Sequence, residues 1–265
     1  MTEQYQTLEV VSDGKIVHLW LNRPEQHNAL NLSMVRELVQ FFEEVNRNDE
    51  VLMVVLRGKG KSFCSGADLD WMQSSVNLTS SGNQAESMEL SGMFEAIYQC
   101  RKVVIGLAHG NTFGGGNGLL AACDIAYCTS ESRFSLSETR LGLVAATIAP
   151  YLLNRMEVSV VKELLFTAFR FDGEMAATKG LVNRMFASYD EMELHTQNTV
   201  QAILEGGPSS VLTSKALLNR LSKYKFPPDT TQMLAKLLAD TRVSDEAQEG
   251  MRAFLEKRKP QWQQD

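Results

Sequence analysis

The stretch Gly110–Asp124, which reads GNTFGGGNGLLAACD, has three consecutive glycines between two apolar runs. The preceding run, Val103–Ala108, is typical of a buried strand, and the following LLAAC is typical of a short buried helix. Because glycine has no Cβ, three in a row allow an unusual turn or the close approach of another group. The stretch therefore predicts a strand-to-helix loop that either packs tightly or presents its backbone to a ligand.

Two nucleotide-binding motifs fail at this loop. A G-x-G-x-x-G fingerprint starting at Gly114 needs a sixth glycine where Leu119 stands. A phosphate loop of the G-x-x-x-x-G-K-[ST] type needs lysine after Gly115, where Gly116 stands. Two interpretations remain, namely tight packing or backbone N–H groups that face a ligand oxygen at a helix N-terminus.

A second loop supports the ligand interpretation. The segment SFCSGADL, Ser62–Leu69, also follows a buried strand and also leads into a helix. Parallel strands end at one edge of a sheet, so N–H groups of the two loops can converge on one oxygen as an oxyanion hole. A third segment, RFSLSETRLGLV, places Glu138 among apolar residues, although an exposed glutamate in a turn is the competing interpretation.

Elsewhere the sequence predicts strands and helices in alternation, which favours an α/β fold with right-handed crossovers and a parallel sheet. The expected elements are a hairpin over residues 8–22, a helix from 33, a strand over 51–58, a mobile polar loop over 73–85 and a helix over 90–100. Beyond about Ala149 the pattern is helical, with helices over 190–205, at VLTSKALLNRL and in a last segment ending AFLEKRKP.

Composition narrows the function classes. The net charge of −6 comes with interspersed charges and no basic face, which argues against nucleic-acid or anionic-membrane partners. The four cysteines have neither metal-ligand nor CxxC spacing, so we expect reduced thiols of an intracellular protein. The N-terminus lacks a signal pattern, and no apolar run reaches the roughly 18 residues of a membrane span. These features predict a cytoplasmic protein without a metal.

Five motifs taken together carry a family resemblance. NRPEQHNAL, SFCSGADL, FGGGNGLLAACDIA, FSLSETRLGL and EGMRAFLEKRKPQW resemble, in order and spacing, the crotonase (enoyl-CoA hydratase/isomerase) superfamily over essentially the whole chain. The resemblance implies an α/β spiral of ββα units over residues 1–195. It also implies a C-terminal helical region over 196–265 that builds a homotrimer or a dimer of trimers and completes the CoA site.

The resemblance also implies acyl-CoA thioester substrates, with coenzyme A as part of the substrate and no separate cofactor. It places the oxyanion donors on the backbone N–H groups of Ser65 and Gly115, which would stabilise a thioester enolate. It identifies Glu138 as the acid/base that exchanges a proton with the substrate carbon. Burial in a dry pocket would raise the pKa of that carboxyl.

For the CoA portion, the resemblance implies contacts from Phe254 and Lys257, commonly to the ligand of a neighbouring subunit. Arg23 is a further phosphate candidate, with an ordinary surface arginine as the alternative. Ala67 and Asp68 line the same loop as Ser65, and Asp68 alternatively caps the following helix.

One position departs from the pattern of the best-known hydratases, which carry a second glutamate two residues after the glycine triplet. Here that position is Gly118. Either Glu138 alone shuttles a proton, as in an enoyl-CoA isomerase, or another group helps to place water. A non-catalytic acyl-CoA binder is the third alternative, although it would not need Glu138 in an apolar setting.

A finer resemblance favours a hydratase. The G-G-G-x-G-L and S-E-x-x-L-G-L patterns followed by IAPYL are similar to bacterial methylglutaconyl-CoA hydratase-like members. A substrate of that kind has its own carboxylate, which either helps to hold water or is bound by a basic side chain. Arg140 and His109 are the candidates from sequence, and His109 alternatively has a structural role at the end of its strand.

Overall fold

The structure is a computed structural model that describes residues 5–76, 78–222 and 229–263. Its main sheet has six strands in the order β1-β2-β3-β4-β6-β9, with only β1 and β2 antiparallel. The strands are β1 (Leu8–Asp13), β2 (Ile16–Leu21), β3 (Met53–Gly58), β4 (Val103–Ala108), β6 (Ile125–Thr129) and β9 (Arg184–Phe186). The predicted hairpin and parallel sheet are therefore confirmed.

A second, three-stranded sheet crosses the first in the order β5-β7-β8. It comprises β5 (Asn111–Phe113), β7 (Arg133–Ser135) and β8 (Phe171–Asp172). Single bridges extend it, since Cys64 pairs with Thr112 and Leu30 pairs with Ala67. Each turn of the chain thus gives one strand to the main sheet, a short extended segment to the second layer and then a helix. This repeated unit is the predicted ββα spiral.

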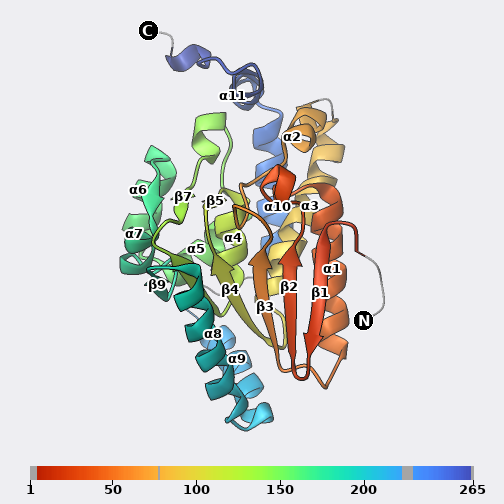
Figure 1. The fold of residues 1–265 in the computed structure, drawn as a ribbon. Helices are drawn as coiled ribbons and strands as arrows, with labels where there is room; N and C mark the ends of the chain where they lie inside the picture. The colour runs from red at the N-terminus through yellow and green to blue at the C-terminus, as the bar shows by residue number, and fades with distance from the viewer. Residues whose placement is uncertain (1–4, 77, 223–228, 264–265) are drawn as a thin grey trace.

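Helices cover both faces of the main sheet (Figure 1). In the first half they are α1 (Leu32–Arg47), α2 (Leu69–Val76), α3 (Ser80–Tyr98) and α4 (Gly115–Ala122), with a short 3₁₀ segment η1 (Pro24–Gln26). Later come η2 (Glu138–Leu141), α5 (Ala149–Arg155), α6 (Val158–Thr167), α7 (Gly173–Thr178), α8 (Tyr189–Leu204), α9 (Pro208–Leu221), α10 (Thr230–Arg242), α11 (Asp245–Leu255) and η3 (Gln261–Gln263).

The polar tract from Gln73 to Ala85 is not the loop that its composition predicts. α2 continues to Val76, and α3 begins at Ser80, where the Thr79 side chain accepts a hydrogen bond from the Gly82 N–H at 3.2 Å. α3 buries polar residues as well as apolar ones, and it packs along α10. Packing against a distant helix therefore outweighs the local polar composition.

The C-terminal region is helical, but one expectation about it was wrong. Short strands β8 and β9 lie beyond Ala149, so the second half is not entirely helical. The boundary predicted between residues 195 and 196 lies within α8, which runs from Tyr189 to Leu204, and the division into two regions stays a prediction.

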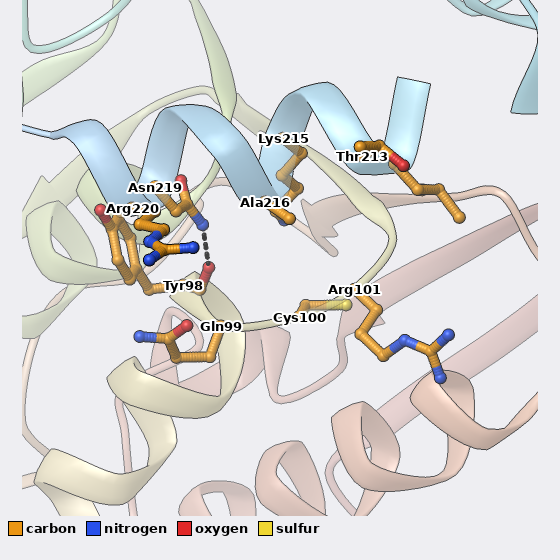
Figure 2. A pocket seen from close by; sticks show the side chains of 10 residues that line it. Tyr98, Gln99, Cys100, Arg101, Thr213, Lys215, Ala216, Asn219 and Arg220 are labelled. Atoms are coloured by element: carbon orange, nitrogen blue, oxygen red, sulfur yellow. Dashed lines mark hydrogen bonds between the residues drawn. The ribbon is translucent and has the colours of Figure 1, made fainter. Parts of the chain in front are cut away.

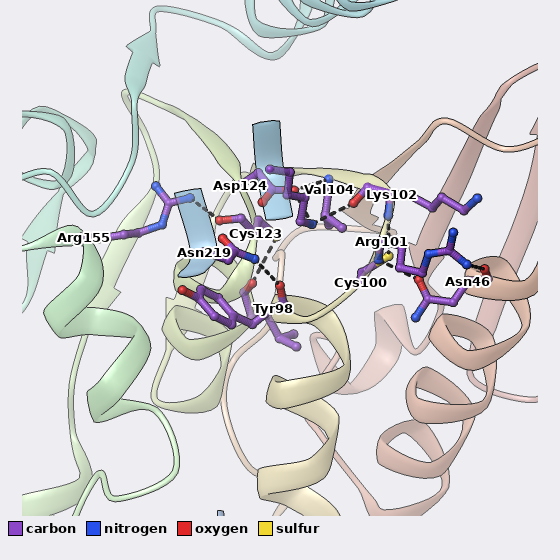
Figure 3. A network of polar contacts seen from close by, with 12 residues as sticks. Asn46, Tyr98, Cys100, Arg101, Lys102, Val104, Cys123, Asp124, Arg155 and Asn219 are labelled. Carbon is purple, nitrogen blue, oxygen red and sulfur yellow. Dashed lines mark hydrogen bonds and ion pairs between the residues drawn. The ribbon is translucent and has the colours of Figure 1, made fainter. Parts of the chain in front are cut away.

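A buried ionic network fastens α9 to the sheet (Figure 3). Asp124 Oδ2 accepts hydrogen bonds from the Val104 N–H and from Lys215 Nζ, both at 2.7 Å. Lys215 Nζ also donates to the Lys102 carbonyl at 2.7 Å. Asp124 therefore has a structural role, because it joins α9 to the start of β4.

All four cysteines are buried and free, in agreement with the expectation of reduced thiols. No helix within the described ranges is long and apolar enough to cross a membrane.

Candidate active site

A cavity of about 1190 Å³ opens at the edge of the main sheet where the parallel strands end. Its walls come from the loops before α2 and α4, from η2, and from α11, which lies above this edge in Figure 1. α11 contacts both α2 and η2, so this chain's own last helix closes the cavity. Ser65, Ala67, Asp68, Gly115, Glu138 and Phe254, all predicted from the sequence, line it.

The two glycine-containing loops pack directly on each other. Gly66 and Gly114 both have positive φ values, +100° and +45°. A Cβ on Gly66 would lie 3.2 Å from the Phe113 carbonyl oxygen, and one on Gly114 would lie 3.5 Å from Glu138 Oε1. Side chains at either glycine would therefore be strained and would crowd the loops and the carboxylate. Tight packing is therefore confirmed, and it brings the backbone of both loops to the cavity.

The donor predicted at Ser65 is wrong. The Ser65 N–H already donates to the His27 carbonyl at 3.0 Å. Ala67 forms a parallel bridge with Leu30. The Leu30 N–H donates to the Gly66 carbonyl, and the Leu30 carbonyl accepts a hydrogen bond from the Asp68 N–H. In such a parallel bridge the N–H of the middle residue points to the opposite side. The Ala67 N–H therefore faces away from Leu30, and no bond to it is made within the described residues.

Gly115 presents the second N–H. It is the first residue of α4, and the first N–H groups of a helix have no partner inside that helix. A Cβ at this position would lie 2.8 Å from Leu30 Cδ1, so a side chain here would require the end of Leu30 to move. The helix N-terminus also adds a partial positive charge that favours an anionic oxygen.

Glu138 begins η2, and its carboxylate lies beside the glycine loop at the start of α4. Its Oε2 atom is buried without a hydrogen-bond partner in the described residues, and its Oε1 atom lies beside Gly114. Burial raises the pKa of this carboxyl from 4.5 to about 7. Gly142 ends η2 with a φ of +67° and packs against Ala247 of α11. The packing of Gly142 against α11 thus fixes η2, and with it Glu138, beside the glycine loops.

The raised pKa of Glu138 predicts a pH-dependent stability difference. The stability that neutral Glu138 contributes is present below the ordinary pKa of 4.5 and is lost as pH rises through about 7. Glu138→Gln, which is neutral at every pH, should therefore be more stable than wild type by about 2 to 3 kcal/mol at pH 8 and by less than about 1 kcal/mol at pH 5. Urea unfolding at the two pH values measures this, and equal stabilities at pH 8 would show that the carboxylate is solvated.

The position of the second hydratase glutamate is filled by neighbouring side chains. A Cβ on Gly118 would lie 2.3 Å from Ile148 Cγ2 and 2.7 Å from Phe94 Cε1. Gly118 is buried in α4 and does not line the cavity. A glutamate here would overlap these side chains, so α4 contributes no carboxylate to the cavity.

Arg23 and Asp68 hold the loop together. The Arg23 guanidinium donates to the Ala29 carbonyl at 2.6 Å and pairs with Asp68 Oδ2 at 2.9 Å. Asp68 Oδ1 accepts from the N–H groups of Asp70 and Trp71, which caps α2. Arg23 is not among the residues that line the cavity, and its contacts in the structure are structural ones.

The two CoA contacts predicted near the C-terminus differ in their place relative to the cavity. Phe254 lines the cavity with 49% of its surface exposed, whereas Lys257 is exposed and lies outside the lining. Arginines that sequence reasoning missed, or considered only for another role, also line the cavity: Arg140, Arg170, Arg242 and Arg258. Arg258 is paired with Glu249 and Glu256. Arg140 and Arg170 are exposed and could bind the phosphates of CoA.

His109 has a structural role at the end of its strand, which was the alternative to binding a substrate carboxylate. Its Nε2 atom lies 2.9 Å from the Gly60 carbonyl oxygen, and its ring packs edge-on against Tyr189. It is not among the cavity-lining residues. The group of acidic, histidine and cysteine residues that a metal would need is absent from the described chain.

A second cavity of about 580 Å³ lies between the end of α3 and α9 (Figure 2). Tyr98, Arg101 and Lys215 are among its walls, next to the start of β4. It lies at the opposite ends of the strands from the glycine loops and Glu138. It therefore has no part in the arrangement described above.

The fold and the cavity define a crotonase-type α/β spiral protein. The chain belongs to the enoyl-CoA hydratase/isomerase family, whose model matches residues 12–265, and it is an enzyme of that family. It is 35% identical over 280 residues to a peroxisomal Delta(3,5)-Delta(2,4)-dienoyl-CoA isomerase of Arabidopsis thaliana, with 98% of each chain covered. It is 30% identical over 259 residues to an enoyl-CoA hydratase of Alternaria alternata, covering 97% of this chain and 84% of that one.

Solved structures agree with this assignment. An enoyl-CoA hydratase from Mycobacterium avium superimposes with a TM-score of 0.84 at 32% identity, covering 97% of this chain and 99% of that one. Both hydratases and isomerases are thus among the similar proteins, and the family is shared by both reactions.

Proposed function

We propose that this enzyme adds water to an α,β-unsaturated acyl-CoA through a thioester enolate. The observation that carries the proposal is the Glu138 carboxylate, whose buried Oε2 atom has no hydrogen-bond partner among the described residues and which shares one cavity with Ala67 and Gly115. Two preorganised donors and one carboxyl with a pKa of about 7 are the groups that enolate formation and protonation need.

The proposed steps use one carboxylate twice. Water bonds to the β-carbon as Glu138 removes its proton, and the electron pair of the carbon–carbon double bond moves to give the thioester enolate. The two N–H groups hold the developing negative charge on the thioester oxygen. The Glu138 carboxyl then returns the proton to the α-carbon, which restores the thioester and the ionised carboxylate.

A second candidate reaction is double-bond migration by the same groups. It is favoured by the packing of Ile148 and Phe94 around Gly118, which leaves no room for a second carboxylate to hold water. It is also the reaction in the name of the Arabidopsis relative. In that case Glu138 would remove a proton from one carbon and return it to another, with the same enolate between the two steps.

For the substrate we propose methylglutaconyl-CoA or a close analogue, on the motif pattern that continues from Ser137 through Leu152. The proposed contact of the thioester is the N–H of Ala67. The proposed contacts of CoA are Phe254 and the exposed Arg140 and Arg170. A homotrimeric or hexameric assembly, a cytoplasmic location and the absence of any cofactor beyond CoA stay predictions.

Side-by-side assays of methylglutaconyl-CoA, crotonyl-CoA and a 3-enoyl-CoA in ¹⁸O-labelled water test the proposal. We expect ¹⁸O to enter the product from methylglutaconyl-CoA, with crotonyl-CoA a poorer substrate. Double-bond migration in the 3-enoyl-CoA without ¹⁸O uptake from any substrate would replace the hydratase with the isomerase.

A further inference from the structure

Arg242, the last residue of α10, is a buried arginine whose charge is not balanced. It is 8% exposed and lines the active-site cavity. Its Nη1 atom is buried without a hydrogen-bond partner, and its guanidinium forms no ion pair with any residue that the structure describes. An unpaired buried cation is costly, because water has been removed and nothing replaces its hydrogen bonds.

The surroundings of Arg242 orient it without neutralising it. Its guanidinium carbon lies 5.6 Å from the centre of the Trp71 ring, a cation–π contact. The Trp71 indole N–H is turned to Glu86 at 2.7 Å, so the nearest carboxylate is engaged with the indole. Burial lowers the pKa of Arg242, and the charge of Glu86 offsets this only in part. The other donors of the guanidinium fork are therefore available to a ligand.

Arg242 shares the cavity with a group of apolar side chains from α2, from α11 and from the segment that contains η2. Met72, just beyond Ala67 on α2, forms an apolar cluster with Met251 of α11 and with Leu141 and Leu143, which follow Glu138. All four of these side chains line the cavity, as does Arg242, which is stacked on the residue before Met72. The cavity thus combines an apolar wall, which suits an acyl chain, with a buried cation.

Neither candidate suggested by the sequence has these properties. Arg140 is exposed and donates to the Thr167 carbonyl at 3.3 Å, and His109 lies outside the cavity. Arg258 also lines the cavity, but Glu249 and Glu256 occupy its guanidinium.

We propose that Arg242 binds a carboxylate at the far end of the acyl chain, so that the substrates are acyl-CoA thioesters bearing a free carboxyl group. A guanidinium and a carboxylate form paired, charge-assisted hydrogen bonds, and the buried site strengthens them. The ligand carboxylate would supply the partner that the folded chain lacks. This inference rests on the proposed function, because it assumes that the cavity holds an acyl-CoA.

Binding of two unreactive thioesters tests the inference without any turnover. Glutaryl-CoA has a terminal carboxylate, whereas butyryl-CoA has the same CoA and a neutral acyl chain. By calorimetry, we expect the wild type to bind glutaryl-CoA about 10- to 100-fold more tightly than butyryl-CoA. Arg242→Met, similar in length but neutral, should reduce this ratio to about one or below, and Arg242→Lys should keep part of it.

The controls separate the possible failures. Arg101→Met, which removes an arginine outside the active-site cavity, should retain the wild-type ratio. Equal affinities in the wild type, or a ratio that survives Arg242→Met, would overturn the role of Arg242 alone. Equal weakening of both thioesters by Arg242→Met would place the guanidinium on CoA and also overturn it. No binding of either thioester by the folded wild type would contradict the proposed function itself.

Discussion

Glu138→Gln is expected to lower kcat by at least about a hundredfold while the affinity for the acyl-CoA changes little. The glutamine fills the same space beside Gly114, but it cannot take a proton from water or give one to the α-carbon. Steady-state kinetics with the best substrate of the assays above, together with calorimetric binding of the same thioester, measure the two quantities.

The pH profile provides an internal check on this prediction. Because burial raises the pKa of Glu138 to about 7, wild-type kcat/KM for water addition should fall as pH drops below about 7, where the carboxyl holds its proton. Turnover by Glu138→Gln within tenfold of wild type, or a profile that stays flat through pH 7, would assign the proton transfer to another group.

Ala67→Pro should lower kcat by about 10² to 10³-fold, because it removes one of the two N–H groups proposed to hold the enolate oxygen. The substitution breaks no hydrogen bond of the described residues, and the preceding Gly66 has no Cβ to clash with the proline ring. Ala67→Gly is the matched control, since it changes the side chain and keeps the N–H. Kinetics and thermal unfolding of both variants should show a folded protein in each case.

The outcome for the proline variant distinguishes the two possible donors. If Ala67→Pro folds and keeps turnover within tenfold of the glycine variant, the oxyanion donor is not Ala67. The engaged Ser65 N–H, bonded to His27, would then have to be released when substrate binds.

The glycine loops and Glu138 could be predicted from the sequence because their signals are local. Two small-residue loops after apolar strands, and a carboxylate among apolar neighbours, stand out in the sequence itself. The choice between Ser65 and Ala67 could not be predicted in this way. It depends on which N–H groups are used by His27 and Leu30, and that pairing exists only in the folded chain.

The role proposed for Arg242 could not be predicted from the sequence either. α10 was not among the predicted helices, and an arginine at the end of a helix ordinarily lies in solvent. Only the packing of α10 along α3 and the stacking on Trp71 bury it against the cavity. The helical structure of the polar segment that begins α3 also depends on the folded chain, since Asn83 Nδ2 donates to the Ser75 carbonyl at 3.2 Å and α3 packs along α10.

Gly118 could be predicted only in part. The sequence shows that a second carboxylate is missing at this position, but it does not show why. The close approach of Ile148 and Phe94 shows that the space is filled, so a glutamate cannot be restored there without moving the core. α4 therefore gives the cavity no carboxylate, and the proposed reaction relies on Glu138.

Exchange of the α-protons of glutaryl-CoA with deuterated solvent tests the central claim most directly, because it needs the enolate but neither water addition nor a double bond. We predict that the wild type incorporates deuterium at the α-carbon, as read by mass spectrometry, and that Glu138→Gln, which should bind the same thioester, does not. Exchange by Glu138→Gln at the wild-type rate, or no exchange by wild-type enzyme saturated with the thioester, would contradict enolate formation by Glu138.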